Sequence, residues 1–172
     1  MQALILAAGM GKRLGRYTKD ATKCMVQVNG KTLIEYAIES LIQNNIKKLI
    51  IVVGYKSQVL IDFIASKFNE KNLTGMEIVF IENKVYDKTN NIYSLYLACN
   101  ELIKDDTILL ESDLIYKPEI ISKLISNNEK NLALPKMDFA ENILNKVEGF
   151  DQINFDNFQL IFDLVKKIHR EP

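Results

Sequence analysis

The sequence contains no tryptophan, one histidine and two cysteines among its 172 residues. Two cysteines, Cys24 and Cys99, are too few for a disulfide framework and lack the spacing of a metal site. Both lie among apolar residues, so we expect buried thiols in a reducing cytoplasm. The histidine, His169, lies beside basic residues, where a solvated position at a helix end is expected. No Ser/His/Asp or Cys/His pairing is recognisable, which argues against nucleophilic catalysis of those types.

An excess of charge and a long apolar run are also missing. The net charge of zero argues against broad binding to nucleic acid or to a membrane surface, which needs a basic excess. No apolar stretch has the length of a membrane span, and residues 1–8 lack the basic start of a secretory peptide. The composition is that of a globular protein, with 48% apolar and 26% charged residues, and the length fits one domain.

The most informative stretch lies at the beginning of the chain. A continuous apolar run over residues 3–8 predicts a buried strand in a parallel sheet. Gly9 and Gly11 follow at once, and Lys12 and Arg13 come next. Glycine lets backbone N–H groups approach an anion, and the neighbouring cations match its charge. The pattern therefore predicts a phosphate-binding turn.

Several interpretations of this turn compete. A Walker loop requires a Gly-Lys-Ser/Thr ending that is not present. A dinucleotide-binding turn requires Gly-x-Gly-x-x-Gly and an acidic residue after the second strand. Here Gly15 comes one residue late, and the second strand ends in Val53-Gly54-Tyr55 without a carboxylate. A strand and turn that bind no ligand remain an open alternative.

The remaining periodicity predicts alternating strands and helices. The expected strands are 3–8, 49–53, 76–81 and 107–110, and the expected helices are 31–45, 56–68, about 90–103 and 117–126. In these helices Val59, Ile92, Tyr96 and Ile103 are among the residues expected to face the core. This order predicts a three-layer α/β/α fold with a mostly parallel, Rossmann-like sheet. Ligands in such sheets bind beyond the carboxyl ends of the strands.

Two motifs resemble a known family. The segment Leu6-Ala7-Ala8-Gly9-x-Gly11-x-Arg13, followed by Thr18 and Lys23, resembles the signature of the sugar-phosphate and choline-phosphate nucleotidyltransferases. The segment 89–97, Thr-Asn-Asn-Ile-Tyr-Ser-Leu-Tyr-Leu, resembles the Asn-Asn-x-Tyr-Ser-Leu block of the choline-phosphate cytidylyltransferase branch. Together the motifs cover residues 1 to about 125, and the resemblance implies the nucleotide-diphospho-sugar transferase type of fold.

The resemblance implies roles for individual residues. Arg13 and Lys23 match the residues that hold the triphosphate, and Asp113 matches the aspartate that binds Mg²⁺. The alternative for Asp113 is an aspartate that begins a turn, and the alternative for Asn90 is helix capping. Further residues expected to contact substrate or nucleotide are Ala8, Gly9, Gly11, Lys12, Gln27, Gly54, Tyr55, Asn90, Asn91, Ser94 and Glu111. Among these, Gln27 and Tyr55 are expected as base contacts.

The implied activity is transfer of a cytidylyl group from CTP to phosphocholine, or to a similar phosphorylated amine or phosphonate, with release of pyrophosphate and dependence on Mg²⁺. A phosphomonoester is already a dianion near pH 7, so it can attack without a general base. A sugar-1-phosphate nucleotidyltransferase and a nucleotide-binding module without turnover remain alternatives. We expect CTP and a small phosphorylated acceptor as partners, no nucleic acid and no membrane, with a homodimer left open.

The end of the chain departs from the family. We expect one domain over residues 1–172, with a nucleotide-binding core at 1–134 and a shortened tail with a closing helix at 135–172. Helices are expected at 136–149 and 155–168, beyond a change of composition near Pro135. Asn154 stands where family members commonly have a second metal-binding aspartate. An aromatic cage for a quaternary ammonium group would have to form without tryptophan.

Overall fold

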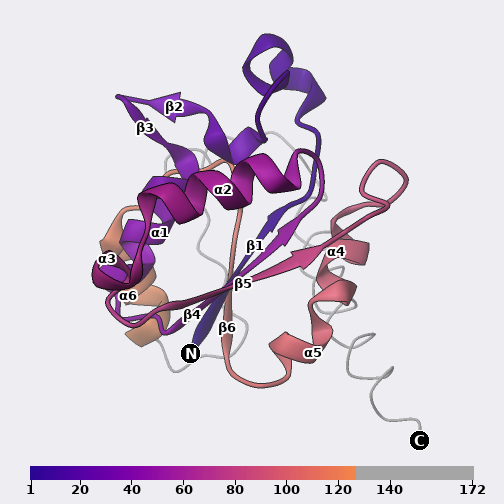
Figure 1. Ribbon diagram of the computed structural model, residues 1–172. Coiled ribbons are helices and arrows are strands. Elements are labelled where there is room, and N and C mark those ends of the chain that lie inside the picture. Colours follow the sequence, from indigo (N-terminus) through magenta and orange to yellow (C-terminus); the bar gives the residue numbers. More distant parts are fainter. Residues whose placement is uncertain (127–172) are drawn as a thin grey trace, which may run out of the picture. The chain divides into compact units, whose positions relative to one another are not determined.

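The computed structural model describes residues 1–126, except for the side chain of Arg13. In this part the unit Met1–Ile125 is built on four parallel strands in the order β5-β4-β1-β6 (Figure 1). The strands are β1 (Gln2–Ala7), β4 (Lys48–Val53), β5 (Glu77–Glu82) and β6 (Thr107–Leu110). Their bounds confirm the predicted strands to within one residue at each end. The predictions for residues 135–172, including those for Asn154 and His169, lie outside the described residues.

The strands form because apolar and often β-branched residues are buried on both faces of the sheet. In β4, the five residues Leu49–Val53 are at most 1% exposed. Successive side chains of a strand point to opposite faces, so Ile5 belongs to one hydrophobic cluster and Leu4 to another. The sheet therefore separates two apolar layers, each of which needs a cover of helices.

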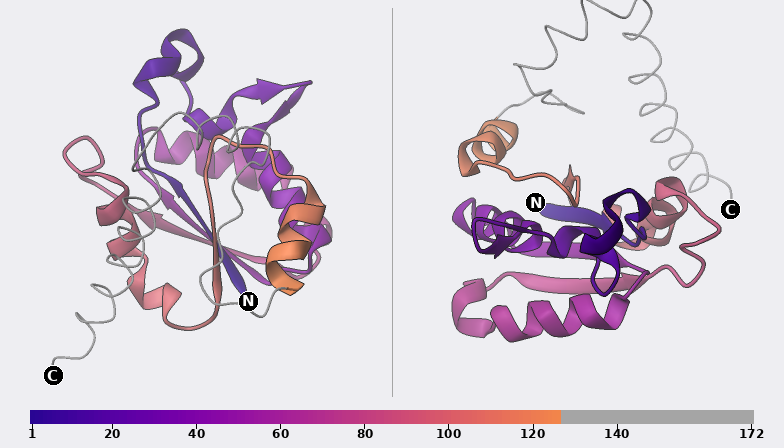
Figure 2. Two further views of the ribbon diagram at one scale, coloured as in Figure 1. Left: turned by 180° about the vertical axis from the view of Figure 1, so that it is seen from behind. Right: turned by 90° about the horizontal axis from the view of Figure 1, so that it is seen from above.

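Six α-helices in the described part of the chain supply this cover on the two faces. They are α1 (Leu33–Gln43), α2 (Ser57–Lys67), α3 (Glu70–Leu73), α4 (Asn91–Leu97), α5 (Cys99–Leu102) and α6 (Pro118–Ser126). Ile38 of α1, Leu60 of α2 and Ile121 of α6 are fully buried in the cluster of Ile5. Ala98, between α4 and α5, is fully buried in the other cluster. Figures 1 and 2 show these two groups of helices on opposite sides of the strands, which confirms the three-layer fold.

The helix predicted for about 90–103 is divided into two short helices. Ala98, with φ −85° and ψ −5°, is both the C-cap of α4 and the N-cap of α5. Ile92, Tyr96 and Ile103 are 50%, 51% and 59% exposed, so their predicted burial is wrong. Val59 of α2 is also exposed, contrary to the prediction.

The two cysteines differ in burial. Cys24 is 1% exposed, and this burial raises the pKa of its thiol to about 11. Cys99 is only partly buried, so the predicted burial is confirmed for Cys24 alone.

The segment between β1 and α1 folds into short elements that the periodicity does not predict. They are two 3₁₀ helices, η1 (Lys12–Thr18) and η2 (Lys23–Met25), and a hairpin of β2 (Gln27–Val28) and β3 (Lys31–Thr32). The helix predicted to start at residue 31 begins instead at residue 33, because Thr32 caps it. The Thr32 N–H donates to Glu35 Oε2 at 2.8 Å, and the Glu35 N–H donates to Thr32 Oγ1 at 3.3 Å.

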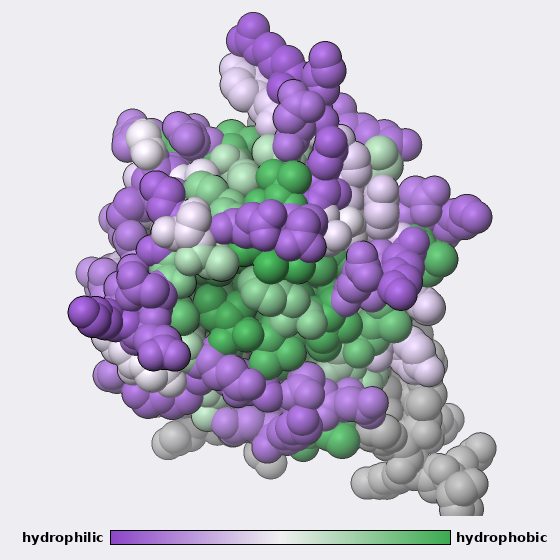
Figure 3. All heavy atoms as spheres, in the orientation of Figure 1, coloured by the Kyte–Doolittle hydropathy of each residue, from purple (hydrophilic) through white to green (hydrophobic). Residues whose placement is uncertain are grey.

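Strand β5 forms one outer edge of the described sheet. Figure 3 shows an apolar area over β5 and below α2, in the orientation of Figure 1. The residues Ile78–Ile81 are only partly buried there, whereas Glu77 and Glu82 at the ends of the strand are exposed. Charged residues on an edge strand discourage its pairing with another chain. None of the helices in the described part is long and apolar enough to cross a membrane.

The strand order reverses beside β1. From β1 the chain passes to β4 and β5 on one side, and then returns to place β6 on the other side of β1. In open α/β sheets a ligand binds where the order reverses, beyond the carboxyl ends of the two flanking strands. Here those ends are Ala7 of β1 and Leu110 of β6, so the segments that follow them form the candidate site.

Candidate functional site

The glycine-rich turn follows β1 directly. Gly11 has φ +61°, and a Cβ at this position would lie 3.0 Å from the Thr18 methyl carbon and 3.2 Å from Lys23 Cβ. Glycine is therefore required for both the conformation and the close packing. A Cβ on Gly9 would meet no atom within 4 Å, and Gly9 is exposed. The backbone of the turn is thus exposed at Gly9, whereas at Gly11 it packs closely against Thr18 and Lys23.

Two buried threonines hold the basic segment after this turn. Thr18 is 4% exposed, and its hydroxyl lies within hydrogen-bond distance of Gly11 O at 3.1 Å and Gly15 O at 3.4 Å. Thr22 is 1% exposed and its hydroxyl lies 3.1 Å from Cys24 Sγ. Hydrogen bonds within the loop that carries Lys12 thereby stabilise its conformation, while Lys12 is exposed at the start of η1. The side chain of Arg13 lies outside what the structure describes.

The structure brings Lys23 and Asp113 together. Lys23 begins η2, Asp113 follows β6, and the Lys23 ammonium forms an ion pair with the Asp113 carboxylate. The two side chains are 31% and 36% exposed, so the pair faces solvent at the point where the strand order reverses. Two motifs that are distant in the sequence therefore meet at one place, as the parallel topology predicts.

Tyr116 fixes the loop that carries Asp113. The Tyr116 hydroxyl accepts from the Glu111 N–H at 2.7 Å and donates to the Glu111 carbonyl at 3.2 Å. Ser40 of α1 in turn donates to the Tyr116 carbonyl at 2.8 Å. Burial raises the pKa of Tyr116 to about 12, with the hydrogen bond to Glu111 opposing this rise. The backbone of Glu111 is thus fixed, whereas its side chain is exposed. No motif in the sequence indicates this role of Tyr116.

Gly54 and Tyr55 support the glycine-rich turn from the neighbouring strand. A Cβ on Gly54 would lie 2.8 Å from the Ala8 carbonyl oxygen and 2.8 Å from Tyr86 Cβ, so only glycine fits. The Tyr55 N–H donates to the Ala8 carbonyl at 3.0 Å, and its hydroxyl donates to the Lys19 carbonyl at 2.9 Å. The ring of Tyr55 also meets Tyr86 edge-on, with 6.1 Å between the ring centroids. In this structure Tyr55 therefore ties the basic segment to the sheet, and its contact with a base stays a prediction.

The asparagine block lies at the start of α4. Asn90 caps this helix, because its side-chain oxygen accepts from the N–H groups of Ile92 at 3.1 Å and Tyr93 at 3.3 Å. Asn91 is the first helical residue and is exposed. Ser94 is 3% exposed and its hydroxyl accepts from Asn83. Helix capping therefore explains the position of the Asn90 side-chain oxygen, whereas Asn91 has no part in the cap and lies at the surface.

Gln27 was predicted as a site residue, and Asn83 was not. Gln27 is exposed in β2 and pairs with Thr32 of the hairpin through the backbone. Asn83, which directly follows β5, is 1% exposed and binds the loop before α4. Asn83 was not among the predicted site residues, although its place after a strand offered a signal.

The residues present suit a divalent cation that is shared with substrate. Among the residues that the structure describes, no group of three or more His, Cys, Asp or Glu side chains could hold a metal ion. Mg²⁺, however, is commonly held by one or two carboxylates together with substrate phosphates. Asp113 lies at the correct edge of the sheet and supplies one such carboxylate.

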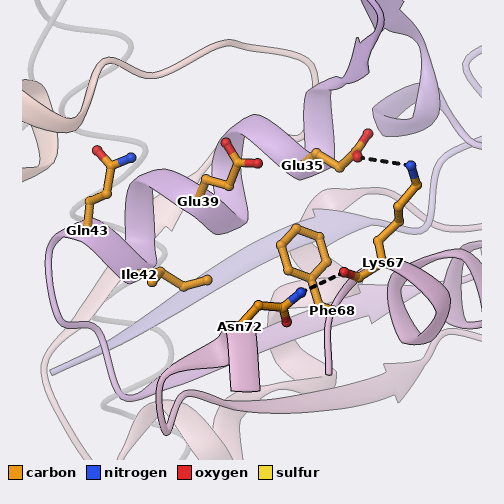
Figure 4. Close-up of a pocket in the computed structure, with 7 residues that line it drawn as sticks. All are labelled: Glu35, Glu39, Ile42, Gln43, Lys67, Phe68 and Asn72. Atoms are coloured by element: carbon orange, nitrogen blue, oxygen red, sulfur yellow. Dashed lines mark hydrogen bonds and ion pairs between the residues drawn. The ribbon is translucent and has the colours of Figure 1, made fainter. Parts of the chain in front are cut away.

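A separate hollow of about 270 Å³ lies between α1 and the end of α2 with α3 (Figure 4). Its lining residues are Glu35, Glu39, Ile42, Gln43, Lys67, Phe68 and Asn72. The charged groups there already have partners: Lys67 lies 3.6 Å from Glu35, and Lys31 lies 2.6 Å from Glu39. None of the predicted site residues lines this hollow.

Comparison with known proteins agrees with this geometry. Residues 3–142 match the model of the MobA-like NTP transferase domain. The CTP:phosphoglutamine cytidylyltransferase of Campylobacter jejuni is 36% identical over 135 residues, which are 76% of this chain and 50% of that protein. A bifunctional protein GlmU of Methanococcus maripaludis is 31% identical over 171 residues, which are 99% of this chain and 36% of that protein.

A solved structure is also similar. The CTP:phosphocholine cytidylyltransferase of Streptococcus pneumoniae superposes with a TM-score of 0.54 and 37% identity, over 69% of this chain and 49% of that one. The chain spans about half the length of the cytidylyltransferases that it matches. The family predicted from the two motifs is confirmed. The chain belongs to the MobA-like NTP transferase family and is similar to its cytidylyltransferases.

Proposed function

We propose that the chain transfers the cytidylyl group of CTP to a small phosphorylated acceptor and releases pyrophosphate. The observation that supports this proposal most strongly is the pairing of Lys23 with Asp113 beside the glycine-rich turn, where the strand order reverses. A nucleoside triphosphate needs backbone N–H groups, a cation and a carboxylate-held metal in one place. The acceptor class is that of phosphocholine and related phosphorylated amines or phosphonates, since similar proteins are named for phosphocholine and phosphoglutamine.

The chemistry requires no protein base. An oxygen of the acceptor phosphate, already a dianion near pH 7, forms a bond to the α-phosphorus of CTP. The bond from that phosphorus to the bridging oxygen breaks, and pyrophosphate leaves with the electron pair. The protein has to align the two phosphates and neutralise their charge. We assign the triphosphate to the Gly9–Gly11 turn with Lys12, Arg13 and Lys23, and the nucleoside to Asn91, Gln27 and Tyr55.

A divalent cation, with Mg²⁺ as the first choice, fits this arrangement at Asp113. When bound, it supplies positive charge that stabilises the phosphates and the leaving group. The side chains of the protein retain distinct tasks: Asp113 orients the cation, and the backbone of Glu111, held by Tyr116, orients Asp113. Lys23 can leave its ion pair to contact the triphosphate, because both partners are about one third exposed.

The experiment is an assay of pyrophosphate release by the full chain with CTP, Mg²⁺ and a series of acceptors: phosphocholine, 2-aminoethylphosphonate, phosphoglutamine and glucose 1-phosphate. We expect turnover with one of the first three and a loss of kcat/KM of about a hundredfold or more for Lys23→Ala, since it removes a charged donor. Lys47→Ala is the matched control, because Lys47 is exposed before β4 at the opposite end of the strands.

The same assay separates the alternatives. Turnover with glucose 1-phosphate and UTP or dTTP would favour a sugar-1-phosphate nucleotidyltransferase. Binding of CTP and Mg²⁺ without turnover of any acceptor would favour a nucleotide-binding module. Unchanged kcat/KM in Lys23→Ala would remove Lys23 from the mechanism.

A further inference from the structure

Asn83 is a fully buried polar side chain at the carboxyl end of β5, with 1% of its surface exposed. Its side-chain nitrogen donates to Thr89 Oγ1 at 3.0 Å and to Ser94 Oγ at 3.1 Å. Its side-chain oxygen accepts from the Val85 N–H at 3.0 Å, and its own N–H donates to the Val53 carbonyl at 2.8 Å. One residue thus joins the sheet, the following loop and α4.

This set of contacts requires an amide side chain. The Thr89 hydroxyl donates its hydrogen to the Val85 carbonyl at 2.9 Å, so its oxygen is left to accept from Asn83. The Val85 N–H in turn needs an acceptor. Only a group with two donor hydrogens and an acceptor oxygen satisfies all three partners at once. The loss of such a buried group leaves its partners unsatisfied, which is costlier than the net gain from one hydrogen bond.

The contacts of Asn83 lie on both sides of Asn90 and Asn91 in the sequence. Thr89 immediately precedes Asn90 and Asn91, and Ser94 lies one turn along the helix that these two residues start. Figure 1 shows the loop before α4 extending beyond the arrowhead of β5. Asn83 therefore clamps both flanks of a surface segment whose own side chains, Asn90 and Asn91, are exposed.

We propose that Asn83 is a positioning residue that holds Asn90 and Asn91 in place for the nucleoside half of the nucleotide. The inference rests on the proposed function, and it assigns the base and ribose to this segment. The triphosphate half depends on other elements, namely the turn after β1 and Lys23 in η2. Loosening the clamp should therefore weaken recognition of the nucleoside and leave recognition of the phosphates unchanged.

The test measures the affinity of the full chain for CTP and for inorganic tripolyphosphate, each with Mg²⁺, by calorimetry. The variants are Asn83→Ala and Thr89→Val. The second keeps the shape of the side chain while removing the Thr89 hydroxyl, and with it the hydrogen bonds to Asn83 and to the Val85 carbonyl. We expect both to bind CTP about tenfold more weakly, the factor that corresponds to one net hydrogen bond, with tripolyphosphate affinity unchanged. Asn69→Ala is the matched control, because Asn69 caps α3 with two similar hydrogen bonds.

Each outcome decides a separate question. If both variants are folded and bind CTP like the wild type, Asn83 has a structural role only and the inference is refuted. Equal losses for CTP and tripolyphosphate would also refute it. If the wild-type chain binds neither ligand, the proposed function fails and the inference fails with it. Should Asn83→Ala not fold, Thr89→Val decides.

Discussion

The ion pair between Lys23 and Asp113 makes a quantitative prediction about the binding of a divalent cation. A cation that binds to the Asp113 carboxylate must displace the Lys23 ammonium from it. Pairs of this exposure contribute roughly 0.2–1 kcal/mol, so removing the competing ammonium should strengthen cation binding by about 1.4- to 5-fold. Lys23→Met is therefore expected to bind Mn²⁺, a spectroscopic probe for the Mg²⁺ site, more tightly than the wild type in the absence of nucleotide.

The measurement is a titration of free Mn²⁺ by electron paramagnetic resonance. Asp113→Asn should abolish the binding, and Lys47→Met, which removes a distant exposed charge, should leave it within experimental error. If Lys23→Met bound Mn²⁺ with unchanged or lower affinity, the ion pair would not compete with the cation. The assignment of the cation to Asp113 would fall if Asp113→Asn retained the binding.

Two further predictions concern stability. Gly54→Ala should lower the free energy of unfolding by about 1–3 kcal/mol, because the new Cβ would lie 2.8 Å from the Ala8 carbonyl oxygen. A thermal melt measures this loss. Gly9→Ala is the control, because a Cβ on Gly9 would meet no atom within 4 Å. Tyr116 has a pKa of about 12 in the folded chain and about 10 when unfolded, so the stability it contributes is complete below pH 10 and is lost between pH 10 and 12. In Tyr116→Phe, alkaline unfolding measured by circular dichroism should no longer show the loss of stability that Tyr116 causes between pH 10 and 12. An unchanged pH profile in this variant would contradict the prediction.

The sheet could be predicted from the sequence because helices cover both of its faces, and its strands therefore read as continuous apolar runs. The meeting of Lys23 and Asp113 could be predicted for the same reason, since parallel strands bring their carboxyl ends to one edge. The split at Ala98 could not, because the residues around it carry enough apolar side chains to imitate one continuous helix.

Other parts of the site depend on side-chain directions that no periodicity encodes. The hydroxyl of Tyr116 reaches back to the backbone of Glu111, and the amide of Asn83 reaches forward to Thr89. Both contacts lie in irregular segments that follow a strand, where each residue has its own backbone conformation. The sequence places such residues near the site but does not say which of them support it.

The charges at the two ends of β5 also affect how copies of this chain can meet. If two copies paired through this edge in antiparallel fashion about the middle of the strand, Glu77 of one would lie opposite Glu82 of the other at both ends of the ladder. Like charges in directly opposed positions destabilise a strand pair. The apolar centre of the edge is thus protected by electrostatic repulsion at neutral pH, and a homodimer of this chain is expected to form through a different surface.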